Sequence, residues 1–187
     1  DTTKSESGVC VNVAAIGRAP MSNIKRRSVA KVGDVVMVTG KLGASAAGLR
    51  DVLNGKLRTR NAKIHLMPEA RVAEGMWLGE QAEVHAMMDI SDGIASDLRH
   101  ILRASGVGAR VELKSLPVSA QLERVCESNG WSRFELATSS GEDYELLLTA
   151  PEEIVQMVDF PLYPIGKITN GEEIEWYNEG KRHEFTT

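Results

Sequence analysis

Apolar and polar positions along the chain follow two different periodicities. Short apolar runs bounded by glycine or polar residues predict strands at 9–16, 34–39 and 84–90. Residues 44–53 place their apolar side chains on one helical face, and so do the residues from Ile94 to Gly106. Both segments are predicted to be amphipathic helices, the second ending at its glycine.

The second half of the chain continues this alternation. Further strands are predicted at 109–113, 144–149, 162–168 and 173–177, and further helices at 119–128, 132–138 and 151–158. A helix is also predicted to open at Pro68, after a basic loop over 54–63. Asn170-Gly171 predicts a hairpin between the last two strands. Alternating strands and helices predict an α/β domain with a mixed sheet covered by helices.

Composition limits the classes of protein that fit this pattern. The chain has 187 residues, of which 42% are apolar and 26% charged, so it can form one packed domain, or one domain plus a remnant of another. Its net charge of −4 argues against a nucleic-acid surface. The apolar runs are far shorter than the ~20 residues that cross a bilayer. Only Cys10 and Cys126 are present, typical of a reducing cytoplasm.

The sequence Asp89-Ile90-Ser91-Asp92-Gly93 is the sharpest chemical motif. It joins the predicted strand at 84–90 to the following helix. Two carboxylates beside the free N–H groups of a helix start suit a Mg²⁺–phosphate assembly, because the metal neutralises phosphate charge and the helix end holds the anion. The motif alone equally fits a plain helix N-cap.

Three other segments carry weaker signals. Gly141-Glu142-Asp143-Tyr144-Glu145-Leu146 places adjacent carboxylates at the start of a buried strand, where α/β folds bind ligands. Asp1-Thr2-Thr3 offers oxygen ligands for a metal, and Lys25-Arg26-Arg27-Ser28 offers partners for phosphate oxygens. Each of these segments alone also fits a solvated loop. Gly40-Lys41 is not a P-loop, because Leu42 stands where the Ser or Thr that holds Mg²⁺ is required.

Taken together, these segments resemble the thiamine-monophosphate kinases, of the superfamily that includes aminoimidazole ribonucleotide synthetase. The blocks that carry the resemblance occur in order from Asp1 to about Gly166. They are Asp1-Thr2-Thr3, Arg27-Ser28-x-Ala30-Lys31-x-Gly33-Asp34 with Thr39-Gly40, Ser45-Ala46-Ala47-Gly48-Leu49, Pro68-Glu69-x-Arg71, Asp89-Ile90-Ser91-Asp92-Gly93 and Gly141-Glu142-Asp143-Tyr144-Glu145-Leu146. The last two blocks are the most specific.

The resemblance implies a function for individual residues. It implies direct transfer of the ATP γ-phosphoryl group to thiamine monophosphate, giving thiamine diphosphate, with Mg²⁺ as the cofactor. Asp1, Asp89 and Asp92 correspond to metal ligands, and Asp1 also to an ATP contact. Arg27 and Ser91 correspond to ATP contacts, and Glu142 to a contact of thiamine monophosphate. No residue is assigned as a covalent nucleophile or as a general acid or base.

The resemblance also implies how the chain is divided. Residues 1–18 correspond to a remnant of an N-terminal ATP- and metal-binding domain, and 19–187 to the C-terminal α/β domain. Family members exceed 300 residues and form homodimers in the cytoplasm, so this chain is expected to be catalytically inert alone. Trp176 and Phe185 do not match the aromatic residue that the family places near its C-terminus.

Two alternatives stay open at this stage. The first is another ATP-using synthetase of the same superfamily, such as a selenophosphate or aminoimidazole ribonucleotide synthetase. The second is a non-catalytic binding domain. The expected partners are ATP and thiamine monophosphate, with neither nucleic acid nor membrane.

Overall fold

A seven-stranded mixed sheet forms the centre of the computed structural model, which describes residues 8–9 and 11–184. The strands lie in the order β2-β4-β1-β5-β3-β6-β7, and β3 with β6 is the only parallel pair among the described strands. Their bounds are β1 Val35–Val38, β2 Ala86–Asp89, β3 Gly108–Glu112, β4 Leu146–Ala150, β5 Tyr163–Thr169, β6 Ile174–Asn178 and β7 Lys181–His183.

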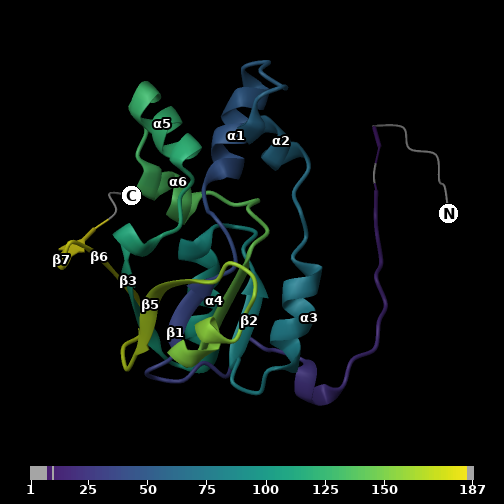
Figure 1. Cartoon of the computed structure of the whole chain (residues 1–187), viewed down its shortest axis with the longest axis vertical. Helices are drawn as coiled ribbons and strands as arrows, with labels where there is room; N and C mark the ends of the chain where they lie inside the picture. The colour runs from purple at the N-terminus through teal and green to yellow at the C-terminus, as the bar shows by residue number, and fades with distance from the viewer. Residues whose placement is uncertain (1–7, 10, 185–187) are drawn as a thin grey trace.

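The described residues form six α-helices. They are α1 Ala44–Leu53, α2 Arg60–Leu66, α3 Val72–Glu80, α4 Ile94–Ser105, α5 Ala120–Asn129 and α6 Arg133–Ser139. Short 3-10 helices lie at Met21–Asn23, Leu113–Ser115 and Glu152–Gln156. Figure 1 shows α1, α2, α5 and α6 gathered beyond one end of the sheet, at the top of the view. None of the helices within the described residues is both long and apolar enough to cross a membrane.

The core follows from the alternation of side chains along β1. Val36 and Val38 point to the sheet face covered by α4, whose Ile94, Leu98 and Ile101 are fully buried there. Val35 and Met37 point to the opposite face and pack with Leu78 of α3. Because both faces are covered, β1 reads as a continuous apolar run. A smaller cluster joins α1, α5 and α6. The α/β prediction with a mixed, helix-covered sheet is confirmed.

The strongest helix predictions are also confirmed. The segment 44–53 is α1, and the helix predicted from Ile94 is α4. Gly106 ends α4 in the left-handed conformation that glycine adopts without steric cost.

The predicted strand at 9–16 is wrong for the residues that the structure describes. Residues 11–16 adopt no regular secondary structure, and Val11 and Ile16 are 78% and 98% exposed. Strand propensity reflects packing on a sheet and pairing with a neighbour, and no strand of the described chain lies beside this segment. The apolar residues alone therefore did not define a strand.

Three other boundaries differ from the prediction. The predicted loop at 54–63 contains the start of α2, where the Thr59 side chain accepts a hydrogen bond from Ala62 N–H. The helix predicted to open at Pro68 begins at Val72. The helix predicted at 151–158 is only the 3-10 helix Glu152–Gln156.

The predicted hairpin at Asn170-Gly171 is wrong, because β3 lies between β5 and β6. Gly108, at the start of β3, leaves no room there for a side chain: an added Cβ would lie 2.8 Å from the Gly171 carbonyl carbon. The hairpin instead joins β6 to β7, where Glu179 and Gly180 both have positive φ. Two successive positive φ values are what a type I′ turn requires.

Candidate functional site

The two most specific motifs lie side by side, where β2 ends and β4 begins. Asp89 of β2 pairs with Leu146 of β4 in the antiparallel register. Beyond this pair the two loops continue to exchange backbone hydrogen bonds. Ile90 N–H donates to Glu145 O at 2.8 Å, and Tyr144 N–H donates to Ile90 O at 2.9 Å. The acidic loop, residues 89–93, and the glutamate turn, residues 141–145, therefore form one structure.

Glycines allow the two loops to approach this closely. An added Cβ on Gly141 would lie only 2.1 Å from Ser91 O. On the opposite loop, Gly93 has φ of +99° and faces Ser140 O. Glu142 N–H donates to Ser91 O at 2.9 Å, which completes the contact. No other residue type fits at Gly141 without separating the loops.

The buried carboxylate of Asp97 binds the backbone of the acidic loop. One oxygen of Asp97, in the first turn of α4, accepts hydrogen bonds from Ser91 N–H at 3.0 Å and Asp92 N–H at 3.1 Å. Burial raises the pKa of Asp97, and these two N–H groups oppose that rise. The side chains of Asp89 and Asp92 are exposed to solvent. No hydrogen bond or ion pair engages either of them within the described part of the chain.

The structure also brings together three possible metal ligands. Ligand atoms of Asp92, Asp97 and His100 all lie within 4.8 Å of one another. The sequence interpretation singled out only Asp92 among these. An acidic residue on the apolar face of the amphipathic helix was the signal that could have identified Asp97, because it lies beside Ile94, Leu98 and Ile101.

The glutamate turn has a strained backbone. Glu142 and Tyr144 have φ of +65° and +52°, which costs non-glycine residues about 1 kcal/mol or more each. Tyr144 OH donates to Glu142 Oε2 at 2.9 Å, and this hydrogen bond raises the pKa of Tyr144. Strain of this kind concentrates at functional sites, where surrounding contacts hold an otherwise unfavourable conformation. Here the strained residue Glu142 donates its N–H to Ser91 O of the acidic loop at 2.9 Å.

Asp143 and Glu145 of the glutamate turn anchor it to the rest of the domain. Glu145 is buried and pairs with Arg71, whose Nε lies 2.7 Å from Oε2 and whose second guanidinium nitrogen lies 2.8 Å from Oε1. Thr39 Oγ1 donates to the same carboxylate at 2.9 Å. An added Cβ on Gly40 would overlap this carboxylate at 2.1 Å, so glycine makes room for it.

Asp143 faces the start of α1. Its carboxylate accepts hydrogen bonds from Gly43 N–H at 2.8 Å and Ser45 N–H at 3.4 Å. Burial raises the pKa of Asp143 to about 7, against the opposing effect of these two donors. The turn is therefore fixed to α1 through a carboxyl group that ionises near neutral pH.

This carboxyl group predicts a pH dependence of stability. Between about pH 4 and pH 7, folded Asp143 keeps its proton while the unfolded chain releases it, so unfolding is favoured as pH rises. Its contribution to the free energy of unfolding should fall by up to about 1.4 kcal/mol per pH unit in this window and level off above it. Urea unfolding of Asp143→Asn should lack this slope relative to the unmodified chain, whereas Glu152→Gln, which alters an exposed carboxylate, should retain it. Equal slopes in all three proteins would contradict the assignment.

The remaining predicted site residues lie elsewhere. Asp1, predicted to bind metal and ATP, falls outside the described residues. Arg27 is exposed, and its carbonyl accepts a hydrogen bond at 2.9 Å from Ser105 Oγ, at the last residue of α4. The acidic loop precedes the first residue of the same helix, so the two ends are separated by about 18 Å of helix. The assignment of Arg27 to ATP stays a prediction.

A cavity of about 410 Å³ adjoins the outer side of the two loops. Asp89 and Tyr144 line it together with Leu146 and the apolar residues Pro68 and Val72. A small organic group placed here would contact the exposed residue Asp89 and the ring of Tyr144. This arrangement suits a ligand with an apolar ring and a charged group.

The fold and these loops are those of a known domain. Residues 31–177 match the family model of the AIR synthase related protein, C-terminal domain. The chain therefore belongs to this family. Among its relatives, it is 41% identical over 159 residues to thiamine-monophosphate kinase from Escherichia coli (strain K12), an alignment that covers 81% of this chain and 47% of that protein.

Solved structures give the same result. Thiamine monophosphate kinase from Aquifex aeolicus is similar with a TM-score of 0.75 and 34% identity, over 86% of this chain and 54% of that chain. A structure of AaThiL complexed with AMPPCP and TMP is similar with a TM-score of 0.73 and 34% identity, over 84% of this chain and 51% of that chain. The chain thus spans about half the length of the curated relatives that it matches.

Proposed function

We propose that this chain is the C-terminal part of a thiamine-monophosphate kinase, which transfers the γ-phosphoryl group of ATP to thiamine monophosphate. The observation that carries this proposal is the hydrogen-bonded contact between the acidic loop and the glutamate turn, the loops that carry the exposed residues Asp89, Asp92 and Glu142. The identity to kinase relatives supports it, and so does the similar structure complexed with AMPPCP and TMP.

The donor set of the acidic loop fits Mg²⁺. Asp89 and Asp92 are exposed carboxylates without hydrogen-bond partners in the described chain, and carboxylate oxygen is the ligand that Mg²⁺ prefers. Both would hold the cation, which when bound supplies charge neutralisation for the transferred phosphoryl group. Asp97 keeps the loop in shape by occupying the N–H groups of Ser91 and Asp92.

The other residues of the site bind and orient the substrates. Ser91 contacts ATP in this proposal, and Glu142 contacts thiamine monophosphate. An oxygen of the substrate phosphate attacks the γ-phosphorus in line, and ADP leaves. Because the attacking oxygen is already ionised, neither a covalent nucleophile nor a general base is required, and catalysis rests on positioning and on charge neutralisation.

The remaining parts of the proposal concern the whole protein. Residues 1–18 are a remnant of an N-terminal ATP- and metal-binding domain, and 19–187 are the C-terminal α/β domain. The family model, which matches residues 31–177, supports the second assignment. Asp1 and Arg27 complete the ATP site from outside the acidic loop. The whole protein acts as a cytoplasmic homodimer, and this chain alone is inactive because it spans half of its relatives.

Replacing Asp92 tests the role of the acidic loop. In the full-length protein that contains this chain, Asp92→Asn should lower kcat for thiamine diphosphate formation by about 100-fold or more, because it removes charge where phosphate is neutralised. Its melting temperature should barely change, because the side chain is exposed. Asp159→Asn, which alters an exposed carboxylate outside the site, should retain full activity. Full activity of Asp92→Asn would remove this residue from the proposed site.

The runner-up is an ATP-using synthetase of the same superfamily. It shares the metal and ATP chemistry of the acidic loop and differs in the acceptor. A substrate panel on the full-length protein separates the two, because only the kinase converts thiamine monophosphate to thiamine diphosphate.

A further inference from the structure

A second, larger cavity lies against the glutamate turn. Its volume is about 630 Å³, within the range of about 300–1,000 Å³ typical of small-molecule sites. It is lined by Asp143 and Glu145 of the turn, by the loop between β1 and α1, by residues of α2, α5 and the start of β5, and by Glu69, Arg71 and Glu74. The proposed phosphoryl transfer does not use this cavity.

The acidic side chains of the turn are neutralised within the protein. Glu145 is held by both edges of the Arg71 guanidinium group and by Thr39. Asp143 accepts two N–H groups at the start of α1, so this helix end is already occupied by a carboxylate. The two other carboxylates of the lining, Glu69 and Glu74, lie 3.6 and 3.9 Å from Arg71 Nη1, so each of the four carboxylates has a partner within the protein.

Three cationic side chains on the rim have no such partner. Lys41 lies in the loop between β1 and α1, Arg60 is the first residue of α2, and Arg124 lies in α5. All three are exposed, and none forms a hydrogen bond or an ion pair through its side chain with any described residue. Because these three cations line one cavity from three elements without a partner of their own, they are available to bind an anion.

The rest of the lining is suited to an organic group. Ile64, Met67 and Pro68 provide apolar surface, and Ser119 and Gln121 provide polar groups. Lys and Arg are the side chains that bind phosphate oxygens most strongly. We propose that this cavity binds a phosphorylated small molecule, with its phosphate held by Lys41, Arg60 and Arg124. This inference is independent of the proposed kinase reaction.

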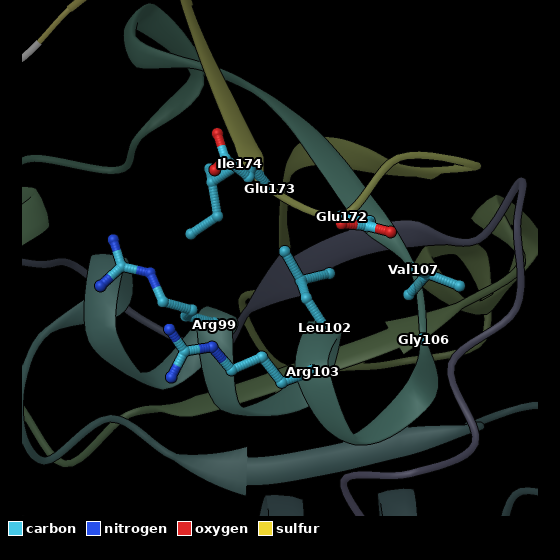
Figure 2. Close-up of a pocket in the computed structure, with 8 residues that line it drawn as sticks. All are labelled: Arg99, Leu102, Arg103, Gly106, Val107, Glu172, Glu173 and Ile174. Carbon is cyan, nitrogen blue, oxygen red and sulfur yellow. The ribbon is translucent and has the colours of Figure 1, made fainter.

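Another cavity offers a less suitable anion site. It has a volume of about 680 Å³ and lies between α4 and the segment that leads into β6. Figure 2 shows Arg99 and Arg103 extending from α4 on the same side of this cavity, with Glu172 and Glu173 on its opposite wall. Neither carboxylate forms a side-chain hydrogen bond or ion pair with a described residue, so both would repel an anion there. Arg99 supplies a matched control, because it is exposed, lies outside the proposed site and forms no side-chain hydrogen bond or ion pair with any described residue.

Calorimetric titration of the 187-residue chain tests the proposal, with pyrophosphate, ribose 5-phosphate and ribose as probes and without Mg²⁺. Both phosphorylated probes are expected to bind saturably, with Kd of about 1 mM or tighter. Ribose is expected not to bind. Lys41→Ala and Arg124→Ala should each weaken binding about tenfold, because each removes a charge-assisted hydrogen bond. Arg99→Ala should bind as the unmodified chain does.

Several outcomes would overturn the proposal. If neither pyrophosphate nor ribose 5-phosphate binds saturably, the site is excluded. Binding of pyrophosphate without ribose 5-phosphate would exclude the organic ligand. An equal loss in Arg99→Ala and Arg124→Ala would indicate attraction by overall charge. Circular dichroism checks that each variant is folded, and Lys41→Arg, which keeps the charge, should retain most of the binding. None of these results bears on thiamine diphosphate formation, so the two proposals fail separately.

Discussion

Replacing Arg71 with alanine is expected to destabilise the domain by about 3–5 kcal/mol. Glu145 is buried, and Arg71 provides two of its hydrogen bonds, at 2.7 and 2.8 Å. Removing the guanidinium group leaves a buried carboxylate with only Thr39 as a side-chain donor. Because small domains are stable by only about 5–15 kcal/mol, this loss should lower the urea midpoint substantially.

Two further variants make this prediction specific. Arg71→Lys keeps a positive charge but loses the two-pronged geometry, so its loss should be intermediate. Arg182→Ala breaks an exposed ion pair with Glu175, whose atoms are 3.8 Å apart, and should cost less than about 1 kcal/mol. Equal losses for Arg71→Ala and Arg182→Ala would show that the buried pair does not anchor the glutamate turn.

Replacing Gly141 with alanine is expected to separate the glutamate turn from the acidic loop. The added Cβ would lie 2.1 Å from Ser91 O, and the close neighbours are backbone atoms that cannot rotate away. We expect a loss of about 2 kcal/mol or more in unfolding free energy from the forced displacement. In the full-length protein, thiamine diphosphate formation should fall by about 100-fold, because misplacement by about 1 Å is costly in catalysis.

The control for this variant is Gly171→Ala. An added Cβ on Gly171 would lie 3.5 Å from Thr169 Oγ1, an ordinary contact, so its replacement should leave stability and activity nearly unchanged. If Gly141→Ala retained full stability and activity, the contact between the two loops would not define the site.

Local sequence patterns predicted those parts of the fold that depend on neighbouring residues. The helix α4 was predicted because its apolar residues recur at helical spacing and Gly106 can end it in the left-handed conformation. The segment 9–16 shows the limit, because a strand requires a partner that no local pattern supplies. The insertion of β3 between β5 and β6 is likewise a long-range choice that a turn signal at Asn170-Gly171 could not reveal.

For the candidate site too, sequence patterns predicted the residues within contiguous motifs but not the contacts between distant positions. Asp89, Ser91, Asp92 and Glu142 were predicted because they lie in contiguous motifs. That these motifs touch follows from the register of β2 against β4, which pairs Asp89 with Leu146. The supporting contacts join distant positions, as Arg71 does with Glu145 across 74 residues, and sequence spacing alone does not identify them.

Formation of thiamine diphosphate is the most direct test of the central proposal. The full-length protein that contains this chain should be incubated with ATP, Mg²⁺ and thiamine monophosphate, and the product measured by chromatography. We expect thiamine diphosphate and ADP in equal amounts, with loss of both products in Asp92→Asn. Absence of thiamine diphosphate from a folded protein that consumes ATP with another acceptor would contradict the kinase assignment and favour a sister synthetase.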